Sequence, residues 1–172
     1  IYSDIMLENH HTNTHVFTQV FNQPDRFGGD IEFATGLVNR LSILSAAPTS
    51  QKDTGSAPYV KTSVFGGGDI KDSIWNFSGM SAPIQLLQDN TYGVGVTVTT
   101  PPLPDTPNFD GTVRSAPLIV SANDQIYPSV ALETLRAFYD QPNYQTRVTP
   151  EVGIEWIRMG RQPPIETTST AD

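Results

Sequence analysis

Apolar and polar residues alternate along the segment from Arg147 to Arg158. Counting by twos divides the segment into two faces, and a two-residue period is typical of a strand that is buried on one side. The segment therefore predicts a half-buried closing strand. Its first face carries Val148, Pro150, Val152, Ile154 and Trp156, and its second carries Thr149, Glu151, Gly153 and Glu155.

Similar alternation, or enrichment in β-branched residues, predicts earlier strands as well. In the segment 92–100 the valines fall on one face, and Gly93 and Gly95 fall on the other. Because glycine leaves room for a close neighbour, we expect another element to pack against that bare face. The windows that predict strands are 14–21, 31–34, 59–65, 74–77, 92–100, 112–121 and 146–157.

One helix is predicted between these strands, over residues 129–139. Leu132, Leu135, Phe138 and Tyr139 recur at helical spacing after Ser129, and an Asp-Gln-Pro run at 140–142 ends the pattern. The segment 36–44 fits either a helix or a strand. Turn residues cluster at 22–30, 46–58, 65–69 and 101–107.

The composition agrees with many short strands joined by turns. Among 172 residues there are 13 Gly and 14 Pro, and 16% of residues are charged. This balance is too rich in turn formers for a helix bundle and too apolar for a disordered chain. We therefore expect a mostly β fold, an antiparallel β-sandwich or jelly roll, with one short helix and long Pro/Gly-rich loops. It forms a single domain over 1–160, followed by a polar tail over 161–172.

Charge and cysteine content exclude several classes of function. The formal net charge is −8 with ten Lys and Arg residues, which argues against autonomous nucleic-acid binding, because such binding needs cations to neutralise phosphates. There is no Cys, so disulfides and thiolate metal sites are excluded. No apolar run approaches the roughly 20 residues of a membrane helix. The start at Ile1 suggests a processed or truncated end.

Two of the three histidines are candidate metal ligands. His11 and His15 are four residues apart and could share a helix face, with His10 beside them. However, Thr12 stands where a metalloprotease motif carries its Glu, and the polar context favours a surface loop. Protonation of the three histidines as a pH switch is a second weak hypothesis.

No other pattern indicates a reaction, and we expect neither a catalytic residue nor a cofactor. Trp75 and Tyr92 are weak candidates for a sugar-stacking platform, but aromatic residues in β-proteins more often belong to the core. Acid pairs such as Glu151 with Glu155 suggest a glycosidase, although solvation of a strand face explains them as well. Loop aspartates could hold calcium without forming an EF-hand pattern. The glycosylation triplet at Asn76 falls within an expected strand.

The last third of the chain resembles a parvovirus-type capsid protein or that of another small icosahedral virus. The likeness runs from 115–120 and 125–128 to the segment 144–156, and Val152-Gly-Ile-Glu-Trp156 carries the match. In that family a strand of this form closes a jelly roll. The tail departs from the family, because Arg161-Gln-Pro-Pro-Ile and a Thr/Ser-rich end replace a long aromatic and basic segment.

The resemblance implies a structural capsid subunit, or a fragment of one, located in the virion and without enzymatic activity. It would assemble with identical copies or sister chains through its loops and contribute to attachment to a host receptor or glycan. Trp156 would lie in the core, and Glu151 and Glu155 would face the shell surface or a neighbour. The alternatives are a carbohydrate-binding β-sandwich module and an acid-pair glycoside hydrolase.

Overall fold

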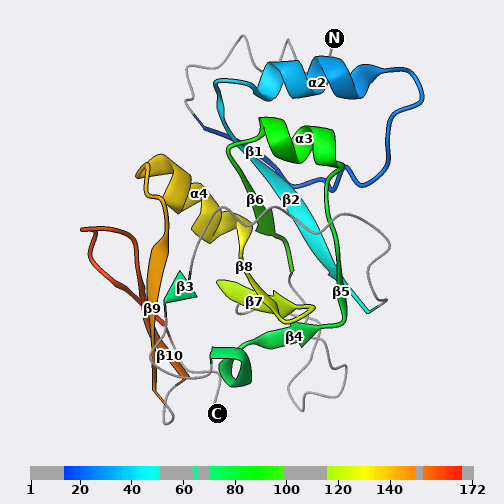
Figure 1. The fold of residues 1–172 in the computed structure, drawn as a ribbon. Coiled ribbons are helices and arrows are strands. Elements are labelled where there is room, and N and C mark those ends of the chain that lie inside the picture. The colour runs from blue at the N-terminus through cyan, green and yellow to red at the C-terminus, as the bar shows by residue number, and fades with distance from the viewer. Residues whose placement is uncertain (1–13, 51–63, 66–69, 99–115, 150–152, 168–172) are drawn as a thin grey trace.

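The computed structural model describes residues 14–50, 64–65, 70–98, 116–149 and 153–167 (Figure 1). The elements of the amino-terminal half are β1 (Thr14–Phe17), α2 (Gly29–Leu37), β2 (Leu41–Thr49), β3 (Val64–Phe65), a 3-10 helix (Ile70–Ser73), β4 (Trp75–Phe77), β5 (Gly79–Ser81), α3 (Gln85–Asn90) and β6 (Gly93–Val96). Those that follow are β7 (Ile119–Ala122), β8 (Gln125–Pro128), α4 (Val130–Phe138), β9 (Tyr144–Thr149), β10 (Gly153–Arg158) and β11 (Ile165–Glu166).

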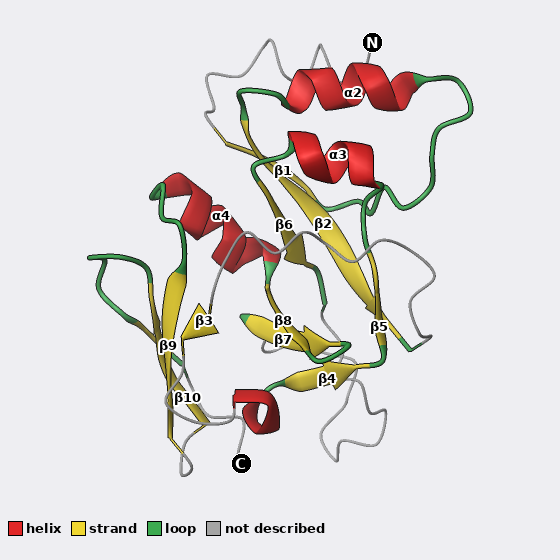
Figure 2. Cartoon of the chain, viewed as in Figure 1, coloured by secondary structure: helices red, strands yellow, loops and turns green. Residues whose placement is uncertain are grey.

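The described strands form three small sheets, and this confirms the prediction of a β-rich fold (Figure 2). In the first sheet, β1 and β6 both run parallel to β2, and β5 pairs antiparallel with the end of β2. The second sheet has the order β11-β10-β9-β3, and the third has the order β4-β7-β8. The expected ladders were antiparallel, but β1–β2, β2–β6, β3–β9 and β4–β7 are parallel.

Helices cover both faces of the first sheet. Ala34 and Leu37 of α2 and Leu87 of α3 share a core cluster with residues such as Leu44 and Val94. Side chains alternate across a strand, so Gly93 and Gly95 point to the opposite face, where they approach Glu133 and Val130 of α4. Figure 1 shows α2 beside α3, with α4 apart from both. The expected close packing on the glycine face is therefore confirmed.

The second core cluster lies between α4 and the other two sheets. Its buried residues include Leu132, Tyr144 and Ile157, with Ile154 packed against them. The two clusters together hold the short sheets around α4, which contributes to the second cluster and contacts strands of the first sheet.

The helix expected over 129–139 is confirmed. Ser129 caps α4, because its Oγ accepts the backbone N–H of Leu132 at 3.2 Å. Of its four expected packing residues, Leu132 is buried, whereas Leu135, Phe138 and Tyr139 are exposed. The prediction of one short helix was wrong, because α2 and α3 are also helical.

The prediction of a strand over 31–34 was wrong. These residues belong to α2, whose start follows Gly28 at φ 81°, and the carboxylate of Asp25 accepts the N–H of Gly29 at 2.9 Å. The segment 36–44 divides between the end of α2 and the start of β2. The first part of the turn expected over 46–58 is also a strand, because β2 continues to Thr49.

The segment that was predicted as one closing strand forms two strands, β9 and β10. β9 and β10 pair antiparallel, with Gly153 opposite Thr149 and Ile154 opposite Val148. The register then shifts, so that Trp156 lies opposite Arg147 and Glu155 has no partner in the ladder. This bulge reverses the alternation, since one extra residue moves the following side chains to the other face.

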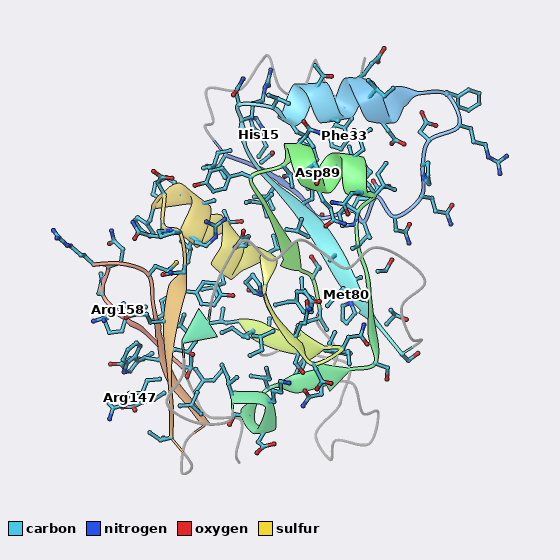
Figure 3. The ribbon with its side chains drawn as sticks, viewed as in Figure 1. His15, Phe33, Met80, Asp89, Arg147 and Arg158 are labelled. Atoms are coloured by element: carbon cyan, nitrogen blue, oxygen red, sulfur yellow. The ribbon has the colours of Figure 1, made fainter. Side chains whose placement is uncertain are left out.

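As a result, Ile157 is buried in the second core cluster, whereas Trp156 is half-buried. The guanidinium carbon of Arg158 lies 5.4 Å from the centre of the Trp156 ring. Figure 3 shows Arg147 and Arg158 on the outer side of the β9–β10 pair. The prediction that Trp156 belongs to the core was therefore wrong, because the bulge turns this side chain to the outer face of the β9–β10 pair.

Candidate functional site

The most distinctive polar cluster among the described residues lies between α4 and the first sheet. Glu133 and Arg136 are one turn apart on α4, and their side chains are 2% and 4% exposed. Arg136 donates from Nε to Oε2 of Glu133 at 2.8 Å and from Nη2 to Oε1 at 2.7 Å. Its Nη1 donates to the carbonyl oxygen of Gln141 at 2.6 Å. Each nitrogen of the guanidinium therefore has an acceptor.

An aromatic side chain joins this ion pair to the sheet. Tyr92 immediately precedes β6 in the chain. The guanidinium carbon of Arg136 lies 5.3 Å from the centre of the Tyr92 ring. The Tyr92 hydroxyl donates to Oδ1 of Asp140 at 2.7 Å. Asp140 holds a left-handed backbone conformation at φ 49° just after the end of α4. Tyr92 thus connects β6 with both the last turn of α4 and its terminus.

The electrostatic environment shifts two of these groups. Burial raises the pKa of Tyr92, and the neighbouring carboxylate of Asp140 raises it further. Burial lowers the pKa of Arg136, but the hydrogen bonds and charge of Glu133 outweigh it, and the net direction is upward. Both shifts favour the protonated forms. The tyrosine therefore serves as a neutral donor and the arginine as a cation.

Gly93 and Gly95 admit α4 to this position. A Cβ on Gly93 would overlap the carboxylate of Glu133, and a Cβ on Gly95 would lie 2.5 Å from the backbone Cα of Val130. Glycine is required at position 95 because a larger residue there would meet the backbone of α4 and push the helix away from β6. The cluster therefore fixes the helix on the sheet, and its acidic and basic groups, Glu133 and Arg136, bind each other.

Only one of the two expected metal ligands lies among the described residues. His15 lies in β1, beside α2 in Figure 3, and His11 lies outside the described residues. Across the described part of the chain, no group of three or more His, Asp or Glu side chains is placed to hold a metal ion. None of the described helices is long and apolar enough to cross a membrane.

The two aromatic candidates lie in different surroundings. Trp75 of β4 packs against the first core cluster, as preferred from the sequence. Tyr92 is held by Arg136 and Asp140. The contacts of these two residues therefore assign each to its own part of the fold rather than to a shared platform.

The polar candidates have structural partners or lie outside the described residues. Glu155 pairs with Arg147 at 2.9 Å, whereas Glu151 falls outside the described residues. Asn76 lies in β4, where its Nδ2 donates to the carbonyl oxygens of Lys71 at 3.0 Å and Ile74 at 3.1 Å. Its Oδ1 accepts the hydroxyl of Ser121. These contacts give the amide of Asn76 a role in the fold.

Sequence reasoning missed the outer side of α4. Both charged residues of this helix face the sheet, while Ala131, Leu135 and Phe138 face solvent. An amphipathic helix usually turns its apolar side to the core. The available signal was the i,i+3 spacing of Glu133 and Arg136, which places both charges on one side, opposite Leu135 and Phe138.

A similar apolar stripe runs along the outer side of α2. Phe27, Ile31 and Val38 are exposed; Ile31 lies in α2, and Phe27 and Val38 flank its two ends. Ala34 and Leu37 of the same helix are buried. Phe27 is 95% exposed and Ile31 is 67% exposed.

Comparison with known proteins assigns no family. No family model matches the chain, and neither a curated protein nor a solved structure matches it.

Proposed function

We propose that the chain is a non-catalytic structural subunit of a viral shell, which assembles with identical copies and resides in the virion. The observation that carries this proposal is the exposed apolar side of α4. Its charged residues, Glu133 and Arg136, are buried, and Leu135, Phe138 and Tyr139 are exposed. We call these three exposed residues the α4 face.

The physical reason is the cost of leaving an apolar face in water while burying charges. Burial of apolar surface contributes about 25 cal/mol per Å², and burial of an ion pair gains little over apolar packing. Leu132 and Ala137 of the same helix are buried, so the apolar residues that α4 leaves in water are Leu135, Phe138 and the adjoining Tyr139. The observed orientation is favourable where another molecule covers the α4 face, which supports a subunit of an assembly.

The exposed residues Phe27, Ile31 and Val38 along α2, here called the α2 stripe, provide a second such surface. The two surfaces lie over opposite faces of the first sheet, because α2 contributes to one core cluster and α4 packs on the glycine side. A subunit with two separate contact surfaces can join more than one neighbour. Such valency is what a shell requires and a simple dimer does not.

The resemblance of residues 115–156 to parvovirus-type capsid proteins supplies the viral part of the proposal. The proposal also includes an antiparallel sandwich or jelly-roll architecture. The antiparallel pairs β7–β8 and β9–β10 support that architecture, whereas the parallel strands of the first sheet do not. Attachment to a host receptor or glycan would be a further role of the assembled shell.

A carbohydrate-binding module is the second candidate, and it requires an exposed aromatic platform. Trp75 and Tyr92 give it little support, because Trp75 packs on a core cluster and the Tyr92 hydroxyl is bonded to Asp140. An acid-pair glycosidase is less favoured, since Glu155 pairs with Arg147. The capsid proposal therefore rests on surfaces that the rival proposals leave unexplained.

The test is the mass of the 172-residue chain in solution. Sedimentation velocity across a wide concentration range should reveal concentration-dependent association, and electron microscopy should show closed particles under assembling salt conditions. Glycan-array binding by a strictly monomeric chain would overturn the capsid proposal in favour of the carbohydrate module. A monomer that binds no glycan would overturn both.

A further inference from the structure

β11 is the edge strand of the second sheet, and it pairs antiparallel with β10. Ile165 lies opposite Ile157, and Glu166 lies opposite Trp156. The two residues of β11 differ in their surroundings, because Ile165 packs against the second core cluster and Glu166 is exposed. β11 therefore joins the sheet through backbone pairing with β10 and through one apolar side chain.

The contacts with β10 continue for one residue beyond β11. The N–H of Thr167 donates to the carbonyl oxygen of Glu155 at 3.3 Å, and the Thr167 hydroxyl donates to the carbonyl oxygen of Ile154. Backbone groups of β10 thus accept both bonds. A second copy of the chain would offer the same acceptors, and its second core cluster would receive Ile165 in the same way. These contacts are therefore the same whichever copy supplies β10.

The connection from β10 to β11, residues 159–164, is an exposed turn followed by a stiff arm. The chain reverses early, where Gly160 has φ 54° and the N–H of Gln162 donates to the carbonyl oxygen of Met159 at 3.0 Å. Pro163 and Pro164 come next, and proline fixes its own φ and keeps the preceding residue extended. Gly160 and both prolines are exposed. Figure 1 shows this connection projecting outward beside β9. A change in the turn alone would therefore move β11 as a unit.

We propose that β11 is an exchangeable strand, which in the assembly pairs with β10 of a second copy instead of β10 of its own chain. The inference rests on the proposed function, because it specifies one contact by which the copies meet. Exchange of an identical element between copies costs little free energy, since every contact of the element is kept. In this protein the change is confined to the turn over residues 159–162.

β9, on the other side of β10, is held too firmly to exchange. Its ladder with β10 runs from Thr149 opposite Gly153 to Gln145 opposite Arg158. Tyr144 of β9 has no exposed surface and belongs to the second core cluster. Moving β9 to another copy would therefore open that cluster. The β9–β10 pair provides an internal reference for the exchange of β11.

Introduced cysteines can report on the exchange directly, because the chain contains no Cys. Two full-length variants, Trp156→Cys and Glu166→Cys, are mixed in urea in equal amounts, refolded together and oxidised. Residues directly opposite each other in an antiparallel pair are close enough for a disulfide. Exchange predicts a disulfide between position 156 of one chain and position 166 of another. Mass spectrometry of proteolytic peptides identifies this product.

The matched control uses Gln145→Cys and Arg158→Cys, which are opposite each other in the β9–β10 ladder of the same sheet. Mixed in the same way, these two variants should give no disulfide between chains, because β9 stays with its own β10. A single chain that carries both substitutions should close internally. If circular dichroism shows that Trp156→Cys does not fold, Glu155→Cys with Thr167→Cys replaces the first pair.

A shorter turn provides a second test on the same chain. Deletion of Arg161 and Gln162 leaves Met159, Gly160 and the two prolines, too little chain to reverse before the extended arm. β11 can then reach β10 of another copy but not its own. In sedimentation velocity this variant should form dimers or larger species at lower concentrations than the wild type. A deletion variant that stays monomeric would overturn the inference.

The outcomes separate the inference from the proposed function. A disulfide between chains at positions 156 and 166, without one at 145 and 158, supports the exchange. Equal yields of the two products, or neither product, from a wild-type chain that assembles would overturn the inference while the capsid proposal stands. A wild-type chain that remains monomeric at every concentration would overturn both.

Discussion

Glu133 and Arg136 form a two-pronged ion pair on the sheet-facing side of α4, with nitrogen–oxygen distances of 2.8 Å and 2.7 Å. A second ion pair, between Arg147 and Glu155 at 2.9 Å, lies on the outer side of the β9–β10 pair, where its side chains are largely exposed. The two pairs have similar distances and different surroundings. The surroundings determine what each contributes to stability.

Replacing Arg136 by Met should destabilise the fold by about 3–5 kcal/mol, because it removes the guanidinium from beside a buried carboxylate. Arg147→Ala is the matched control, and its effect should stay below about 1 kcal/mol because solvent screens an exposed pair. Urea unfolding followed by circular dichroism measures both. Equal losses in the two variants would show that α4 does not hold a buried ion pair.

The cluster around Tyr92 predicts a dependence of stability on alkaline pH. Burial and Asp140 raise the pKa of Tyr92 in the folded state above the ordinary value of 10.0. Below that value the tyrosine is protonated in both states, and its contribution is constant. As the pH rises above it, the unfolded chain loses this proton first, so the free energy of unfolding falls.

Tyr92→Phe should remove this part of the alkaline loss. The measurement is the free energy of unfolding near pH 8 and at two values above the ordinary tyrosine pKa, for the variant and the wild type. The variant should be less stable near pH 8 by about 1 kcal/mol, the usual contribution of one hydrogen bond, and should lose less stability at high pH. Parallel pH profiles would contradict the prediction.

The packing of α4 on β6 predicts a large effect at Gly95. A Cβ there meets the helix backbone at Val130, which cannot move aside without shifting α4, so Gly95→Ala should cost about 1–3 kcal/mol or more. Gly28→Ala is a useful comparison, because nothing lies within 4 Å of its added Cβ although its φ is 81°. Gly28→Ala should therefore cost about 1 kcal/mol through backbone strain alone. A smaller thermal shift for Gly95→Ala than for Gly28→Ala would refute the close contact.

The sequence was informative where local chemistry determines the structure. Ser129 provides a capping hydroxyl, so the start of α4 was predictable, and its expected position agrees with the observed one. The alternation of Val and Gly in β6 correctly indicated a close neighbour, although it did not identify α4 as that neighbour.

Long-range pairing explains the errors. Residues 31–34 alternate like a strand, yet they form a helix because Ala34 and Leu37 pack with Leu87 of α3. The side of α4 that faces the sheet was also not predictable from periodicity. Spacing defines two sides of a helix, and the glycines of β6 together with Tyr92 select the charged one.

The bulge at Glu155 predicts an inverted order of importance for two neighbouring residues. Ile157 has no exposed surface in the second core cluster, so Ile157→Ala should cost about 2–5 kcal/mol. Trp156→Ala removes a larger side chain but should cost only about 1–2 kcal/mol, because the ring is half-buried and its contact with Arg158 contributes about 0.5–1 kcal/mol. Urea unfolding of the two variants provides the comparison.

An independent measurement uses Trp75→Phe as the background, in which acrylamide should quench the remaining fluorescence of Trp156 efficiently. Strong protection from acrylamide, together with the larger loss of stability in Trp156→Ala, would place Trp156 in the core and remove the bulge.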